Sequence, residues 1–257
     1  MSTIAAAALF ACALWWSLTG AILYLDALPR SRLPWAMILA SVVLAAALPV
    51  VAASATHRDP WAAYVAFGAA LLVWAWVEFA FLSGYVTGPR KHPCPVDCTG
   101  LRHFAHAAET VLYHEMALAA AGTIVFTITQ DAPNRVAAWT FAALWCMRLS
   151  AKLNLFLGVR NRSEQLLPAH LAYLGAFFGR RTINPLFPFS ILAAAAAFAL
   201  LAARCIADTG TPRAAGSALI AALVALGLLE HCFLVLPFPS ERLWSWYRRE
   251  TVRGPRI

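Results

Sequence analysis

The chain has 257 residues, of which 61% are hydrophobic and 12% charged, and its mean hydropathy is +0.68. This composition is too apolar for a soluble domain of this length and indicates a polytopic membrane protein. The formal net charge of +8 does not call for a nucleic-acid partner, because membrane topology and anionic lipid account for where the basic residues lie.

Seven segments are apolar and long enough to cross a bilayer, whose hydrocarbon core needs about 20 residues of helix. We therefore expect an all-α bundle of about seven transmembrane helices, forming one membrane domain over residues 1–257. The first segment is interpreted as a retained helix, because Met1-Ser2-Thr3 offers no basic signal region. The predicted spans are residues 4–25, 35–55, 61–86, 106–130, 136–158, 187–207 and 214–237.

The basic residues predict an orientation for this bundle. Sixteen of the twenty Lys and Arg residues fall on one side of the predicted spans. The exceptions are Arg58, Arg135, Arg204 and Arg213. The positive-inside rule then places the N-terminus outside and the C-terminus in the cytoplasm.

Two segments on the predicted cytoplasmic side carry a pattern of their own. Residues 163–181 predict a helix lying on the membrane surface, with a packed or re-entrant connector as the alternative. The tail, residues 238–257, predicts an interfacial anchor. The side chains behind these two interpretations are Leu167, Leu171, Leu174, Phe177 and Phe178 in the first segment, and Trp244, Trp246 and Tyr247 in the tail.

The six cysteines do not suggest a disulfide framework. Cys12, Cys146, Cys205 and Cys232 lie within predicted spans, where a thiol is an ordinary apolar side chain. The other two lie in a loop that the predicted topology places in the cytoplasm, where thiols stay reduced, so we expect no structural disulfide.

These two loop cysteines, Cys94 and Cys98, have a spacing compatible with a zinc site. His92 and His103 are the donors that would complete it. The alternative is a loop that is simply stiffened by its three prolines.

Polar side chains at membrane depth are the main functional signal, because a charge there is costly unless it is paired or bound. Four predicted spans place such side chains at similar depth in the cytoplasmic half, which predicts one shared site. The candidate residues are Glu78 in the third span, His106, Glu109, His114 and Glu115 in the fourth, with His103 just before it, Arg148, Lys152 and Asn154 in the fifth, and Glu230 and His231 in the seventh.

Three interpretations of this set remain open. The carboxylates could form ion pairs with Arg148 or Lys152 that fix helix packing. One of His106, His114 or His231 could ligate the metal of a bound tetrapyrrole. A non-haem metal such as iron could bind several of these side chains, as in di-iron bundles, although the order His-x-x-Glu is the reverse of that motif. The candidate ligands for this last site are His114, Glu115, Glu78, Glu230 and His231.

Several stretches together resemble one known family. They are Trp76–Phe79 with Gly84–Arg90, Arg102–Phe104 with Leu112–Glu115, Leu144–Trp145 with Ser150–Asn161, and Leu229–His231 with Phe233–Pro237. The chain is similar in these stretches to the PuhE family, the photosynthetic complex assembly protein 2 of purple phototrophic bacteria. The resemblance extends from about residue 70 to residue 247.

The resemblance implies a multi-pass protein of the bacterial inner membrane, cytoplasmic or intracytoplasmic, that helps to assemble photosynthetic pigment–protein complexes. It implies an influence on bacteriochlorophyll supply or delivery, with bacteriochlorophyll or a precursor as the expected ligand. Its expected partners are reaction-centre or light-harvesting polypeptides, or pigment-synthesis enzymes. The family's polar motif residues correspond to Glu78, Arg90, His103, His114, Glu115, Arg148, Lys152, Asn154, Glu230 and His231.

The resemblance brings no established active site, and we expect an assembly role rather than catalysis. The alternative is a membrane metalloenzyme that acts on a tetrapyrrole or a lipid, with non-haem iron held by glutamates and histidines. Glu109 is a further candidate ligand in that case.

Overall fold

The computed structural model describes residues 3–95, 97–162, 164 and 167–236, and this part of the chain is helical and contains no strand. Seven α-helices and one 3₁₀ helix follow one another along the chain. They are α1 (Thr3–Asp26), α2 (Leu33–Ala55), α3 (Pro60–Leu82), α4 (Gly100–Thr129), α5 (Val136–Leu157), the 3₁₀ helix η2 (Ala169–Phe177), α6 (Leu186–Ala207) and α7 (Arg213–Phe233).

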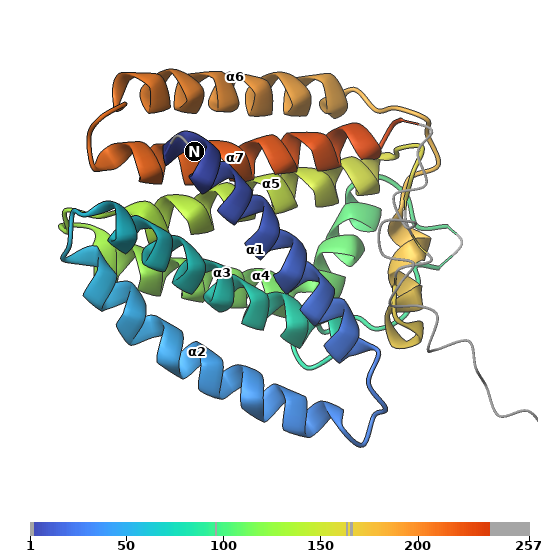
Figure 1. Cartoon of the computed structure of the whole chain (residues 1–257). Coiled ribbons are helices and arrows are strands. Elements are labelled where there is room, and N and C mark those ends of the chain that lie inside the picture. The colour runs from blue at the N-terminus through green and yellow to red at the C-terminus, as the bar shows by residue number, and fades with distance from the viewer. Residues whose placement is uncertain (1–2, 96, 163, 165–166, 237–257) are drawn as a thin grey trace, which may run out of the picture.

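The connections between helices gather at two ends of the bundle (Figure 1). Short turns join α2 to α3, α4 to α5 and α6 to α7 at one end. The longer connections, from α3 to α4 and from α5 through η2 to α6, lie at the other end. Short and long connections therefore alternate between the two ends of the bundle.

Six of the described α-helices are long and apolar enough to cross a membrane, namely α1, α2, α3, α4, α6 and α7. These helices indicate a multi-pass membrane protein. The seventh, α5, lies where the fifth span was predicted and has 22 residues, but it carries Arg148 and Lys152 and is not among the six. Length and composition therefore support six of the seven predicted spans.

Helix α3 lies at the centre of the bundle. Fourteen of its 23 residues are buried, whereas only three of the 22 residues of α6 are. One side of α3 packs with α2, α4 and α5 around Val73 and Trp74, and the ring of Trp74 meets Phe141 edge-on at 5.4 Å. The other side packs with α1 and α7 around Phe67 and Leu219. A helix that is apolar and buried on several faces forms the core of such a bundle.

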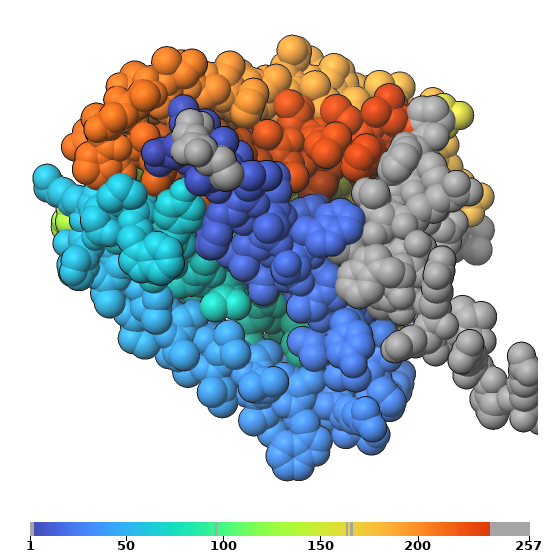
Figure 2. All heavy atoms as spheres, in the orientation of Figure 1, coloured from blue at the N-terminus to red at the C-terminus, as the bar shows by residue number. Residues whose placement is uncertain are grey.

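Helices α1 and α2 cover α3 only in part. In Figure 1, α1 crosses the bundle diagonally and diverges from α2. In Figure 2, side chains of α3 are visible in the hollow between them. Trp76 on α3 donates from Nε1 to the Ser41 Oγ of α2 over 3.0 Å, which ties these two helices together.

The segment predicted as a surface helix over residues 163–181 has a different structure. Its helical part is the 3₁₀ helix η2, which lies across the end of the bundle (Figure 1). Leu171, Leu174 and Phe177 are buried, and they recur every third residue, which matches the three residues per turn of a 3₁₀ helix. His170 Nε2 lies 2.8 Å from the Leu82 carbonyl, which holds η2 against the end of α3, and its position on the membrane surface stays a prediction.

Parts of two other predictions lie outside the described residues. The predicted tail, residues 238–257 with Trp244, Trp246 and Tyr247, is outside them, as are residues 163, 165 and 166. At the third span, α3 ends at Leu82 rather than at residue 86, because a turn at Ser83 leads into Gly84 with a positive φ of 83°.

The loop between α3 and α4 lies directly against α4. Gly88 packs on the α4 backbone so closely that a Cβ atom there would meet the Glu109 carbonyl oxygen at 2.0 Å. The neighbouring Thr87 carbonyl accepts a hydrogen bond from the His114 backbone N–H at 2.9 Å. Only glycine permits this approach of two backbones.

We predict that Gly88→Ala destabilises the protein by at least about 1–3 kcal/mol, the usual cost of overpacking, because the added methyl group collides with rigid backbone. The measurement is the free energy of unfolding in mixed micelles. Gly68→Ala is the matched control, since its Cβ would lie 3.6 Å from the Leu14 side chain, an ordinary contact. Equal stability of the Gly88→Ala variant and the wild type would contradict this packing.

Candidate intramembrane polar site

Glu78 is the buried carboxylate of the central helix, and its residue is only 5% exposed. Arg148 on α5 donates from Nη2 to Glu78 Oε2 over 3.1 Å. The other oxygen, Oε1, lies 3.8 Å from His114 Nε2 on α4. Three helices therefore meet at this one carboxylate.

A second ion pair joins α4 to α5. Lys152 donates from Nζ to Glu115 Oε1 over 2.6 Å, and Trp145 donates from Nε1 to Glu115 Oε2 over 3.2 Å. Trp145, Arg148 and Lys152 follow one another at spacings of three and four residues, so α5 presents all three from one side. The predicted ion-pair network is therefore present in the structure.

His231 on α7 is fully committed to hydrogen bonds. Its Nδ1 lies 2.9 Å from the Gly227 carbonyl, and its Nε2 lies 2.9 Å from the Ser150 hydroxyl of α5. A carbonyl only accepts, so Nδ1 carries a proton, and Nε2 shares a hydrogen bond with the Ser150 hydroxyl. Neither ring nitrogen is free for a metal, and the bond to Ser150 ties α7 to α5.

His114 is wholly buried and less well satisfied. Its residue is 0% exposed, and its ring lies against that of Phe81 with the centroids 4.5 Å apart. Neither ring nitrogen makes a hydrogen bond to the described protein atoms. The Glu78 carboxylate lies beside the ring, with Oε1 3.8 Å from Nε2.

The cluster reaches the protein surface at two charged side chains. The side chain of Arg148 is 45% exposed, and Glu230 on α7 is exposed as well. The two lie close enough to interact electrostatically. We use the term polar cluster for the residues that meet where α3, α4, α5 and α7 pack together, namely Glu78, His114, Glu115, Arg148, Lys152, Glu230 and His231.

The other four predicted site residues lie elsewhere. His103 stacks on Phe156 and Phe177, with centroids 5.5 and 5.4 Å apart. Asn154 is buried and donates to Ser190 Oγ over 2.9 Å, which joins α5 to α6. Glu109 pairs with Arg90 of the preceding loop at 2.8 Å, and His106 contacts the two loop cysteines.

Trp145 and Ser150 belong to this network but were not predicted from the sequence. Trp145 lies three residues before Arg148, and that spacing is the signal that could have identified it. Ser150 gives no such signal, because a serine in an apolar helix usually bonds to its own backbone.

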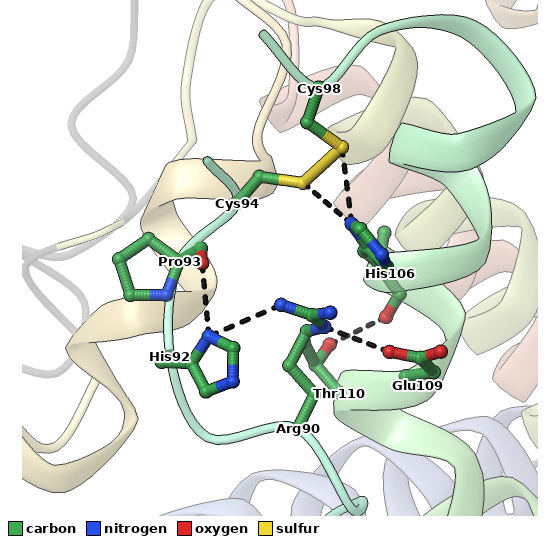
Figure 3. A network of polar contacts seen from close by, with 9 residues as sticks. Arg90, His92, Pro93, Cys94, Cys98, His106, Glu109 and Thr110 are labelled. Atoms are coloured by element: carbon green, nitrogen blue, oxygen red, sulfur yellow. Dashed lines mark hydrogen bonds and ion pairs between the residues drawn. A yellow bond between two sulfur atoms is a disulfide. The ribbon is translucent and has the colours of Figure 1, made fainter. Parts of the chain in front are cut away.

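The loop cysteines differ from the prediction in two ways. The structure joins Cys94 and Cys98 as a disulfide, so the expectation of two separate thiols is wrong for this structure. The nearby histidine is His106 rather than the predicted pair of His92 and His103 (Figure 3). His92 points its Nδ1 instead toward the Pro93 carbonyl at 3.2 Å.

The predicted metal ligands of the membrane interior do not form a compact donor set. Within the described part of the chain, three donor atoms that lie within 4.8 Å of one another occur at Cys94, Cys98 and His106. Glu78 and Glu115 face cations instead, and His231 faces a hydroxyl. A groove of about 530 Å³ is lined by α2 side chains and Tyr85, and none of its lining residues belongs to the polar cluster.

We predict that Glu115→Gln destabilises the protein by about 3–5 kcal/mol, because Lys152 then lacks its counter-charge in a poorly hydrated site. The double variant Glu115→Gln with Lys152→Met should recover part of this loss, with a coupling energy of about 0.5–3 kcal/mol. Unfolding free energies in mixed micelles give both values.

Arg162→Gln is the control for these variants. It removes a pair with Glu164 whose side chains are 32% and 43% exposed, so its effect should stay below about 1 kcal/mol. Strict additivity of the two substitutions at Glu115 and Lys152 would show that the pair does not contribute to stability as a unit.

Comparison with known proteins places this chain in a family. A family model described as "Protein of unknown function (DUF3623)" matches residues 1–254. A Rhodobacter capsulatus protein named "Uncharacterized 30.4 kDa protein in puhA 5'region" is 38% identical over 237 residues, which cover 90% of this chain and 86% of the relative. No solved structure matches the chain significantly. The chain therefore belongs to the family described as Protein of unknown function (DUF3623).

Proposed function

We propose that this protein is a membrane assembly factor for photosynthetic pigment–protein complexes, the reaction centre and core antenna, and that it acts on bacteriochlorophyll supply or delivery. The name of the Rhodobacter capsulatus relative refers to the puhA 5' region, and this supports a photosynthesis-related role for the present chain. The resemblance of the polar stretches to the PuhE family supports the assembly role.

We further propose that all seven α-helices cross the inner membrane, with the N-terminus outside. α5 is not among the six helices apolar enough by composition, and it supplies the cations of the polar cluster. Its Arg148 and Lys152 contact carboxylates on α3 and α4, and paired charges are far less costly at membrane depth than isolated ones. The distribution of Lys and Arg residues supports the orientation.

The observation that carries the proposal is the exposed part of the polar cluster. Arg148 and Glu230 are exposed on helices of a membrane protein, whereas Glu78 beneath them is buried. Lipid chains offer no hydrogen-bond partner to such groups. A polar group on a transmembrane polypeptide would satisfy them, so this surface favours docking of a partner helix.

The histidines also favour a docking surface for a partner helix over a pigment carrier that binds its pigment through a histidine. An axial ligand must present a ring nitrogen to the pigment. His114 is wholly buried, and both nitrogens of His231 are engaged. We therefore propose that the protein acts beside the apoproteins that receive pigment and contacts them through Arg148 and Glu230.

We predict that Glu230→Gln lowers the yield of assembled reaction-centre and core-antenna complex severalfold in a phototrophic host that lacks the native gene. The variant protein should still accumulate in the membrane, because Glu230 is exposed and its loss leaves the ion pairs Glu78–Arg148 and Glu115–Lys152 intact. Near-infrared absorption of the membranes gives the complex yield, and immunoblotting gives the protein level.

Glu164→Gln is the matched control, since it removes a glutamate that lies outside the polar cluster. Normal complex yield in the Glu230→Gln strain at normal protein level would refute the role of this surface. Normal yield in a strain without the gene would refute the assembly function itself.

A further inference from the structure

The loop that joins α3 to α4 brings three metal-binding side chains to one point. Cys94 Sγ lies 3.0 Å and Cys98 Sγ lies 3.1 Å from the same atom, His106 Nδ1 (Figure 3). Two sulfurs and one imidazole nitrogen are donors typical of a zinc centre, and a C-x₃-C spacing falls within the range of known zinc sites.

From this convergence we propose that Cys94, Cys98 and His106 form a zinc-binding site when the two cysteines are reduced. The thiols release two protons to solvent as the Zn²⁺ ion binds two thiolates and the neutral imidazole. Two thiolates balance the charge of the ion, so the centre is neutral. Water or an outside donor fills the fourth position of the tetrahedron.

The loop is fixed to α4 in a way that preorganises this site. Gly88 and Thr87 pack on the α4 backbone near Glu109 and His114, as described above. Arg90 adds an ion pair to Glu109 over 2.8 Å. Glu109 lies three residues after His106, so the pair that anchors the loop and the imidazole that receives the sulfurs share one side of α4.

The two sulfurs are partly shielded from water. Cys98 is only 7% exposed, and Cys94 is partly buried. Arg90 and Arg102 lie close enough to act electrostatically on His106, the third donor. Tetrahedral zinc holds its donor atoms about 3.5 Å apart. The Cα atoms of the two cysteines are 6.0 Å apart, a spacing compatible with that separation of the sulfurs.

The same two cysteines report on the orientation of the protein. A reduced, zinc-binding pair requires a reducing compartment, whereas a lasting disulfide indicates an oxidising one. A zinc site here therefore requires the α3–α4 loop to lie in the cytoplasm, the orientation that the distribution of Lys and Arg residues also favours. The proposed zinc site does not depend on the proposed assembly role.

The test measures the metal content and the thiol state of the full-length protein, purified in mild detergent without chelator. In one sample the thiols are blocked in intact cells before purification, and in another they are left free. The unblocked wild type should retain about one zinc ion per chain, bound by a three-donor centre of this kind. Cys94→Ser and His106→Ala should each lose it. Substitution with Co²⁺ should give thiolate charge-transfer absorption in the near ultraviolet, and this absorption should disappear in Cys94→Ser.

His92→Ala and Cys146→Ser are the controls, since they remove a histidine of the same loop and a cysteine of α5 that is exposed and free. Both should keep the zinc. A wild type without metal, whether its two thiols are free or joined, would overturn the site. Joined thiols in intact cells would in addition place this loop outside and reverse the proposed orientation.

Discussion

The structure depends on keeping a carboxylate inside a membrane bundle. Glu78 lies on α3, the helix with the most buried surface, where an ionised group without a partner would be severely destabilising. Arg148 supplies that partner from α5. Because the pair links the central helix to a neighbour, it favours one rotation of α5 about its axis and therefore fixes which other α5 side chains face α4.

This requirement explains why α5, which is not among the six candidate spans of the described residues, carries two cations. Its Arg148 and Lys152 side chains form ion pairs with carboxylates on α3 and α4. Its Ser150 hydroxyl shares a hydrogen bond with the His231 imidazole of α7. A purely apolar helix in this place could pack but could not satisfy any of these groups. Buried pairs of this kind rarely add stability over an apolar core, so their retention is better explained by specificity of packing or by function. The exposed end of the network, at Arg148 and Glu230, favours function.

Much of this arrangement could be predicted from the sequence, because helix length, depth and face follow from residue counting. Counting placed Glu78, Glu115, Lys152 and His231 at similar depth. Neighbouring helices could not be predicted this way, so the pairing of Glu78 with Arg148 and of Glu115 with Lys152 stayed open. The histidine beside the cysteines was also missed, since the loop path depends on the contact of Gly88 with α4. In η2 the buried residues recur every third position, the period of a 3₁₀ helix, and this period became visible only in the structure.

We propose that the surface of α7 beside Glu230 faces a photosynthetic polypeptide. A photo-crosslinking residue placed at Leu229, which is 48% exposed, probes this surface in membranes of a phototrophic host. The same residue at Leu39 of α2, which is 62% exposed, is the control for a surface that faces lipid. We expect an adduct with a reaction-centre or antenna polypeptide from position 229 and only lipid adducts from position 39. Lipid adducts alone at both positions would refute the docking of a polypeptide on this surface.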